Sequence, residues 1–225
     1  MNPQLPEVPQ SPLGWLWQPP RPIPTAHNGT MWLSRRLGRW RLFGLDGSDQ
    51  ATPYMDRLWS RTLGRIASSS GISVQGALIL GVALGATPAL VRRRWPEAEV
   101  VAVDCEPSLF ALGRALGIHD ISLDDPRTRF LAGDAAQVVP RLERRFDLVL
   151  VDLFRGRSLA AAATAPALID GVADRLTPGG VAAVNVFSQP AALEVWRRRF
   201  ARVNVTRCEV NLVGLFEEPV PPRPT

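Results

Sequence analysis

The 225-residue chain contains no lysine, and it has only two cysteines, two histidines and one tyrosine. Cys105 and Cys208 lie far apart, so the sequence offers neither a disulfide framework nor a Cys-X-X-Cys metal motif. With so few histidines as well, a structural zinc site of Cys and His ligands is excluded. We therefore expect no metal in this protein.

Long apolar runs are also missing. No stretch reaches the length of about 18 apolar residues that predicts a membrane span, and no charged segment followed by an apolar segment marks a secretory signal. We therefore expect a cytoplasmic protein without membrane contact. The chain is 46% hydrophobic and 21% charged, which is ordinary for a globular protein and sufficient for one sizeable core.

The charge is moderately basic, with a formal net value of +5 and every basic side chain an arginine, apart from the two histidines. The densest runs, Arg92–Arg94 and Arg197–Arg199, lie inside amphipathic helix patterns. Such runs are more typical of solvated helix faces than of a nucleic-acid footprint. The charge alone therefore does not predict a nucleic-acid partner.

The chain divides into four segments by composition. Residues 1–30 contain eight prolines, which exclude a helix or a central strand and predict a mobile or extended arm. A short hairpin and a helix are expected within 31–75, the core within 76–217, and a flexible tail within 218–225.

From residue 76 onward, strand and helix patterns alternate. This alternation predicts an α/β fold with a Rossmann-like, mostly parallel sheet of seven strands and helices on both faces. In such sheets ligands bind beyond the carboxyl ends of the strands. The predicted strands are 77–80, 99–103, 129–131, 146–151, 181–187, 203–209 and 211–216, and the predicted helices are 87–95, 107–116, 135–144, 165–176 and 191–201.

A glycine loop and a carboxylate stand where a nucleoside would bind. Gly81 and Gly85 belong to the loop that follows the first core strand, where glycines let the backbone approach a ligand. Asp104 ends the second core strand and can accept hydrogen bonds from both hydroxyls of a ribose. A tight turn and a solvated carboxylate explain each feature singly, but the pair favours a ribose-bearing ligand.

Two further carboxylates end the next strands. Asp134, followed by Ala135, can accept a hydrogen bond from an adenine amino group or cap the next helix. Asp152 ends the apolar strand 146–151, where an ionised group is disfavoured unless it faces a cleft or a partner. We therefore expect Asp152 on the substrate side of the same sheet edge.

The motifs in their order resemble the class I S-adenosylmethionine-dependent methyltransferase fold and, more narrowly, the spermidine synthase-like family of polyamine aminopropyltransferases. The resemblance covers roughly residues 40–216. The matching segments are Leu45-Asp46-Gly47-Ser48-Asp49-Gln50, Tyr54-Met55-Asp56, Gly81–Ala86, Val103-Asp104-Cys105-Glu106-Pro107, Gly133-Asp134-Ala135, Val151–Gly156, Leu176–Gly180 and Asn185-Val186-Phe187.

The resemblance implies a transferase that uses decarboxylated S-adenosylmethionine, or S-adenosylmethionine itself, as co-substrate. It implies that Tyr54 and Asp152 border a small amine acceptor, with Asp152 taking the amine proton. It also implies a place in polyamine biosynthesis and a possible homodimer. The residues implied to hold the nucleoside are Gln50, Gly81, Gly85, Asp104, Glu106, Asp134 and Ala135.

Two departures from the family pattern keep other functions open. Leu84 replaces the loop aspartate that anchors the donor's ammonium, and Arg155 replaces the second acidic residue of the acceptor segment. Methyl transfer to a small neutral or acidic acceptor is therefore the close alternative, and a non-catalytic nucleoside-binding protein is another. An NAD-dependent oxidoreductase is disfavoured because the loop is not Gly-X-Gly-X-X-Gly.

Overall fold

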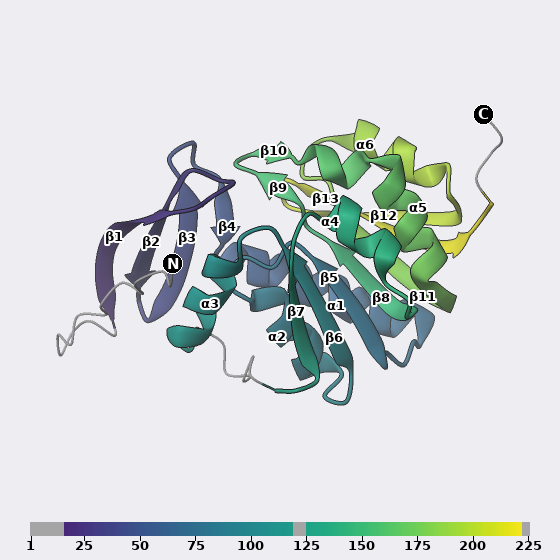
Figure 1. Cartoon of the computed structure of the whole chain (residues 1–225), viewed down its shortest axis with the longest axis horizontal. Helices are drawn as coiled ribbons and strands as arrows, with labels where there is room; N and C mark the ends of the chain where they lie inside the picture. Colours follow the sequence, from purple (N-terminus) through teal and green to yellow (C-terminus); the bar gives the residue numbers. More distant parts are fainter. Residues whose placement is uncertain (1–15, 119–124, 222–225) are drawn as a thin grey trace.

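The computed structural model describes residues 16–118 and 125–221. Its centre is a seven-stranded sheet in the order β12-β13-β11-β8-β5-β6-β7 (Figure 1). The strands from β7 to β11 in this order run parallel, and β13 and β12 complete the sheet as antiparallel strands. The predicted fold class, a Rossmann-like α/β sheet of seven strands, is confirmed.

The elements follow the predicted alternation. The strands of the central sheet are β5 (Gly76–Leu80), β6 (Glu99–Asp104), β7 (Thr128–Ala132), β8 (Phe146–Val151), β11 (Leu176–Asn185), β12 (Phe200–Cys208) and β13 (Asn211–Pro219). The helices are α1 (Pro53–Ser70), α2 (Ala86–Arg94), α3 (Pro107–Ala115), α4 (Ala135–Val138), α5 (Pro166–Arg175) and α6 (Pro190–Arg197), with 3-10 turns at Val139–Arg141 and Ala161–Thr164.

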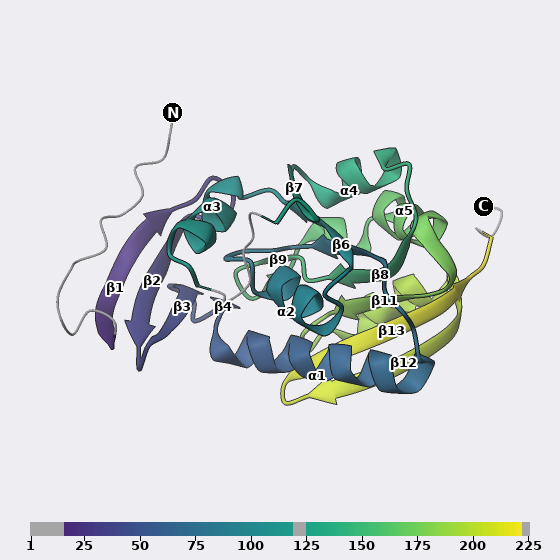
Figure 2. The same ribbon diagram turned by 90° about the horizontal axis from the view of Figure 1, so that it is seen from below.

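Helices cover both faces of the sheet because its strands are apolar on both sides. Every residue of β5 is buried, and so are five of the six residues of β8. On one face the side chains of alternate strand residues pack against α4, α5 and α6. On the other face they pack against α1, α2 and α3. Figure 2 shows α1 beneath the sheet, on the side opposite to α4 and α5.

A separate four-stranded antiparallel sheet precedes the core (Figure 1). It consists of β1 (Trp17–Pro24), β2 (Thr30–Arg36), β3 (Arg39–Gly44) and β4 (Asp49–Ala51). The arm predicted over 1–30 therefore contains a strand, and the hairpin expected after residue 31 is larger than predicted. The prolines of β1 are compatible with this because β1 is an edge strand with an irregular register between Gln18 and Arg21.

Some element boundaries differ from the predicted ones. The helix predicted over 135–144 ends at Val138 and continues as a 3-10 turn. The segment from Thr177 to Gly180, predicted to end a helix, lies inside β11 as an irregularity in its pairing with β8. Strand β13 reaches Pro219, so the first two residues of the tail predicted over 218–225 belong to a strand. Residues 1–15, 119–124 and 222–225 lie outside the described part.

The order of the strands creates a switch point between β5 and β8. The chain passes from β5 outward to β6 and β7, then returns to place β8 on the other side of β5. The loops after β5 and β8 therefore leave the sheet side by side. Ligand sites in open parallel sheets form at this crevice.

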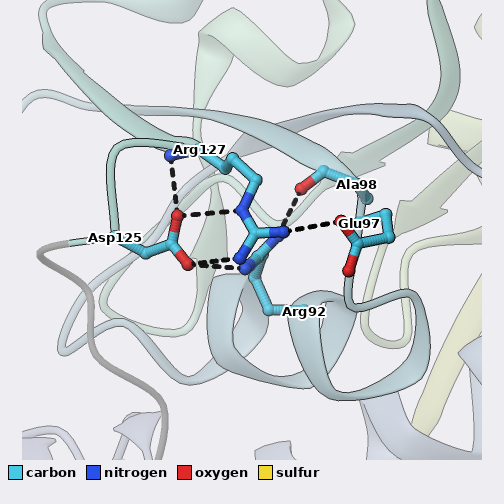
Figure 3. A network of polar contacts seen from close by, with 5 residues as sticks. All are labelled: Arg92, Glu97, Ala98, Asp125 and Arg127. Atoms are coloured by element: carbon cyan, nitrogen blue, oxygen red, sulfur yellow. Dashed lines mark hydrogen bonds and ion pairs between the residues drawn. The ribbon is translucent and has the colours of Figure 1, made fainter.

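A network of ion pairs lies at the amino ends of the parallel strands, opposite to this crevice (Figure 3). The buried guanidinium of Arg92 donates to Asp125 at 2.7 Å and to the carbonyl of Ala98 at 2.8 Å. Arg127 also donates to Asp125 and pairs with Glu97 at 2.8 Å. These hydrogen bonds hold the pKa of Asp125 far below its usual range, with Arg127 as the largest cause. The network connects α2 with the segment that enters β7.

Within residues 16–118 and 125–221, no helix is both long enough and apolar enough to cross a membrane.

Candidate active site

A cavity of about 1000 Å³ lies at the carboxyl ends of the parallel strands, between the core and the N-terminal sheet. Loops from both parts of the molecule form its wall, including the turn between β1 and β2. Seven of the nine residues predicted to form the site line this cavity. They are Gln50, Tyr54, Gly81, Asp104, Asp134, Ala135 and Asp152.

Gly81 is at the switch point, where the loops after β5 and β8 touch. The amide of Asp152 donates to the carbonyl of Leu80 at 2.8 Å. A Cβ atom on Gly81 would lie 2.1 Å from the carbonyl oxygen of Asp152, and Gly81 has a positive φ of 86°. Both the space and the backbone conformation therefore require glycine at this position.

Asp104 holds the glycine loop in place. Its Oδ2 accepts hydrogen bonds from the amides of Val82 at 2.7 Å and Ala83 at 3.0 Å. Its Oδ1 accepts from the amide of Glu106 at 2.8 Å. An ionised carboxylate has about four acceptor positions, so these three bonds leave room for one strong bond to a ribose hydroxyl. The sequence predicted bonds to both hydroxyls.

Asp134 caps α4 and also lines the cavity. Its Oδ1 accepts from the amide of Ala136 at 2.8 Å. The two alternatives considered for this residue, helix cap and ligand contact, are compatible because only one oxygen is used in the cap. Ala135 lines the same part of the cavity.

Gly85 and Glu106, also predicted to hold the nucleoside, do not line the cavity. Gly85 is the N-cap of α2 in a left-handed conformation. The carboxylate of Glu106, a residue only 2% exposed, accepts hydrogen bonds from three consecutive backbone amides of the turn between β1 and β2. The corrected role of Glu106 is to fix that turn, whose residues His27 and Asn28 form part of the cavity wall.

The packing of Leu84 explains why an apolar residue stands where the resemblance implies a loop aspartate. Its side chain is 1% exposed and belongs to the cluster that packs the N-terminal sheet against α3. The partners in that cluster include Met31 and Leu42 of the N-terminal sheet and Leu109 of α3. A carboxylate at position 84 would be buried among them without a partner, which is costly.

A short hairpin that the sequence did not predict follows Asp152. It consists of β9 (Phe154–Arg155) and β10 (Ser158–Leu159). Gln50 donates from Nε2 to the carbonyl of Gly156 at 3.2 Å, and Asp46 accepts from the amide of Arg157 at 3.2 Å. Gln50, predicted to hold the nucleoside, therefore also anchors this hairpin at the cavity.

Arg155 and Arg157 flank the tip of the hairpin, and both line the cavity. Both are exposed. Within residues 16–118 and 125–221, neither guanidinium has a hydrogen bond or an ion pair. The wall beside Asp152 therefore carries two guanidinium groups that form no ion pair with a carboxylate of the described residues.

Asp152 is held by two neutral donors. Its Oδ2 accepts from Nε1 of Trp59 at 2.8 Å, and its Oδ1 accepts from Nδ2 of Asn185 at 2.9 Å. Burial raises the pKa of this carboxyl group above its usual value, and the two hydrogen bonds oppose the rise only in part. A carboxyl group with a raised pKa beside a cleft is suited to accept a proton from a substrate.

Tyr54 lines the cavity, but its hydroxyl is engaged with the protein. The hydroxyl lies 2.5 Å from Oδ1 of Asn211 and 2.9 Å from the carbonyl of Cys208. Burial raises the pKa of Tyr54, and Cys208 and Glu209 add to the rise. The residue therefore stays a neutral donor at neutral pH.

Three residues of this arrangement were not predicted as site residues. They are Trp59, Asn185 and Asn211, and all three line the cavity. Asn185 ends an apolar strand, so the reasoning applied to Asp152 could have found it. Trp59 reaches the site through the packing of α1, and Asn211 reaches it through the pairing of β13 with β11. The sequence predicts a helix and a strand there but not these contacts.

No protein-family model matches the chain, and no curated protein matches it in sequence. Its structure is similar to that of spermidine synthase from Thermotoga maritima, at 16% identity and a TM-score of 0.69, covering 88% of this chain and 72% of that one. It is also similar to a probable spermidine synthase from Corynebacterium glutamicum, at 17% identity and a TM-score of 0.60, covering 88% and 76%.

Methyltransferases are similar over a smaller part of the chain. Human methyltransferase-like protein 13, solved in complex with S-adenosylhomocysteine, matches at 18% identity and a TM-score of 0.58, covering 73% of this chain and 81% of that one. Together these comparisons show that the chain has the fold shared by spermidine synthases and S-adenosylmethionine-dependent methyltransferases.

Proposed function

We propose that this protein is a transferase that binds a sulfonium nucleoside, S-adenosylmethionine or its decarboxylated form, and transfers a carbon group from its sulfur to a small acceptor. The observation that carries the proposal is the cavity at the switch point, where Gly81, Asp104, Asp134 and Asp152 converge from four parallel strands. Neighbouring structures of this fold bind S-adenosylhomocysteine or the analogue AdoDATO.

Each carboxylate has a distinct task in this proposal. Asp104 accepts a ribose hydroxyl while it holds the loop amides, and Asp134 accepts from the adenine amino group. Asp152 takes the proton of the acceptor as the new bond to carbon forms and the carbon–sulfur bond breaks. The sulfur leaves as a neutral thioether, so the enzyme mainly contributes positioning and general-base assistance.

Aminopropyl transfer to an amine, as in polyamine biosynthesis, is the first candidate within this proposal. Its support is the share of the chain that the spermidine synthase structures cover, which is 88%. The methyltransferase structures match 73–75% of it.

Methyl transfer is the second candidate, and two observations favour it. Leu84 is buried in the interface with the N-terminal sheet, so the glycine loop has no carboxylate for the ammonium group of a decarboxylated donor. Arg155 and Arg157 line the cavity without ion-pair partners in the described chain. Unpaired guanidinium groups repel a diamine and favour a neutral or acidic acceptor.

Calorimetric binding of four nucleosides tests the proposal and separates the two candidates. The ligands are S-adenosylmethionine, decarboxylated S-adenosylmethionine, S-adenosylhomocysteine and methylthioadenosine. Preference for the decarboxylated donor and methylthioadenosine supports aminopropyl transfer, and preference for the carboxylated pair supports methyl transfer. Binding of none of them at about millimolar affinity or better, near 4 kcal/mol, overturns the proposal.

Asp104→Ala is the informative variant, with Asp147→Ala as its matched control. Loss of a hydrogen bond to a charged acceptor predicts affinity weaker by roughly tenfold to a hundredfold in Asp104→Ala. Asp147 also accepts two backbone amides, those of Gln75 and Gly76, but it lies at the opposite end of the sheet. Its substitution should leave the affinity unchanged, and an equal loss in both variants would indicate a general effect on folding.

A further inference from the structure

A chain of hydrogen bonds crosses the sheet behind Asp152. The hydroxyl of Tyr54 contacts Oδ1 of Asn211 at 2.5 Å, and Nδ2 of Asn211 donates to Oδ1 of Asn185 at 2.8 Å. Nδ2 of Asn185 donates to Asp152 at 2.9 Å, and the other oxygen of Asp152 accepts from Trp59. Five side chains, from α1, β11, β13 and the loop after β8, are therefore connected.

One backbone amide fixes which way the side-chain amides of this hydrogen-bonded series are oriented. The amide of Phe187 donates to Oδ1 of Asn185 at 3.0 Å, so that atom must be the oxygen of the side-chain amide. The nitrogen of Asn185 must then face Asp152, and the nitrogen of Asn211 must face Asn185. The oxygen of Asn211 is left to face Tyr54. The amide hydrogens of Asn211 and Asn185 therefore point toward Asp152, and the single hydroxyl hydrogen of Tyr54 is shared between Oδ1 of Asn211 and the carbonyl of Cys208.

Burial makes this order rigid. Asn185 is 1% exposed and Asn211 is 3% exposed. A reversed amide would place two donors or two acceptors in contact at these positions, at the cost of unsatisfied buried polar groups. The strands β13, β11 and β8 are neighbours in the sheet, and Tyr54 and Trp59 both belong to α1. Helix α1 thus holds this series of hydrogen bonds at both ends, through Tyr54 and Trp59.

We propose that Asn185, Asn211 and Tyr54 are positioning residues that fix the carboxylate of Asp152 for the transfer reaction, and that Tyr54 acts through this chain and not by contact with the acceptor. This inference rests on the proposed function. It differs from the prediction made from the sequence, in which Tyr54 borders the acceptor directly.

The proton equilibrium of Asp152, followed at the indole N–H of Trp59 by NMR, tests the inference without any substrate. The indole resonance of Trp59 is assigned by its loss in Trp59→Phe. Its shift with pH reports the protonation of Asp152, since the two groups share a hydrogen bond. The variants are Tyr54→Phe, which removes a single oxygen atom, and Asn211→Leu, which interrupts the chain.

We expect the midpoint of this titration to rise by roughly half a pH unit to one unit in each variant, because the chain's donors stabilise the ionised carboxylate. Asn204→Leu, an exposed asparagine of β12, is the matched control and should not move the midpoint. Unchanged midpoints in both Tyr54→Phe and Asn211→Leu, or an equal shift in the control, would overturn the inference.

Two further measurements separate this inference from the proposed function. Nucleoside affinity in Tyr54→Phe should stay within about twofold of the parent chain, since the tyrosine acts on Asp152 and not on the donor site. With an active donor and acceptor, kcat should fall with little change in KM, and the acidic limb of the pH profile should move with the NMR midpoint. A shifted midpoint in a protein that binds no nucleoside sinks the proposed function alone. Nucleoside binding with an unshifted midpoint sinks this inference alone.

Discussion

The two ends of the central sheet use carboxylates differently. At the amino ends of β6, β7 and β8, three carboxylates, those of Asp125, Glu97 and Glu99, pair with Arg92, Arg127 and Arg144. A fourth, Asp147, accepts hydrogen bonds from backbone amides. At the carboxyl ends, Asp104, Asp134 and Asp152 accept hydrogen bonds from neutral backbone amides or side chains. Paired charges favour stability, whereas the three carboxylates at the carboxyl ends are held by neutral donors and line the cavity, so they remain available to a ligand.

The comparison predicts that removing a carboxylate at the carboxyl end impairs chemistry and not folding. Under the proposed function, Asp152→Asn should lower turnover by about a hundredfold to ten-thousandfold, as expected for loss of a general base. Tm should change little, because relief of the buried charge offsets the contact between the new amide nitrogen and one donor, Trp59 or Asn185. Single-turnover assays with thermal denaturation measure both effects, and a large drop in Tm would contradict this prediction.

Gly81→Ala should break the close approach of two loops at the carboxyl end. We expect a loss of about 2–4 kcal/mol in the free energy of unfolding, from the clash with Asp152 and the positive φ. Gly71→Ala is the matched control, since Gly71 also has a positive φ but nothing within 4 Å of the added Cβ. Urea denaturation measures both, and similar losses in the two variants would show that backbone strain alone matters.

Asp125→Asn tests the amino end of the sheet. The substitution leaves the buried guanidinium of Arg92 without its counter-charge, so Tm should fall, although less than in Gly81→Ala. Nucleoside affinity should not change, because Asp125 lies at the end of the sheet away from the cavity. A loss of nucleoside affinity with an unchanged Tm would contradict the assignment of stability to the amino end and ligand binding to the carboxyl end.

The smallest expected effect is a difference between Asp125 and Asp152 in how their contribution to stability depends on pH. The pKa of Asp125 is lowered in the folded state, so its contribution is present above about pH 4, its ordinary value, and is lost as the pH falls toward the folded pKa. The Tm difference between the parent chain and Asp125→Asn should therefore shrink in acid.

Asp152 has the opposite sign. Its pKa is raised in the folded state, so the ionised form costs stability at neutral pH, and this cost disappears as the pH falls through the folded pKa. Any gain in Tm of Asp152→Asn should therefore be largest near pH 7 and vanish in acid. Thermal denaturation across pH 3–8 measures both slopes, and slopes of the same sign would refute the comparison.

The core of the fold follows from local patterns in the sequence. Apolar strands such as Phe146–Val151, separated by helix patterns and glycine loops, determine the order of the elements and the edge where the carboxylates gather. The same reasoning led to Gly81, Asp104, Asp134 and Asp152, all of which line the cavity.

What local patterns could not supply is contact over long sequence separations. Strand β1 was missed because its prolines argue against a strand, although an edge strand accepts them. Glu106 was assigned to the ligand because its partners, the amides of residues 26–28, lie about 80 positions away. The side chain of Leu84 likewise fills an interface that exists only once the N-terminal sheet has docked.

The three hydrogen bonds by which Glu106 holds the turn between β1 and β2 have a thermodynamic consequence. Asp104 holds the glycine loop at the cavity, and two residues later Glu106 holds the turn between β1 and β2, so one short stretch of backbone serves both tasks. The docking of the N-terminal sheet and the occupancy of the cavity are then coupled equilibria. By linkage, whatever free energy a ligand gains from the docked sheet, the docked sheet gains from the ligand. The N-terminal sheet is thus part of the affinity of the site.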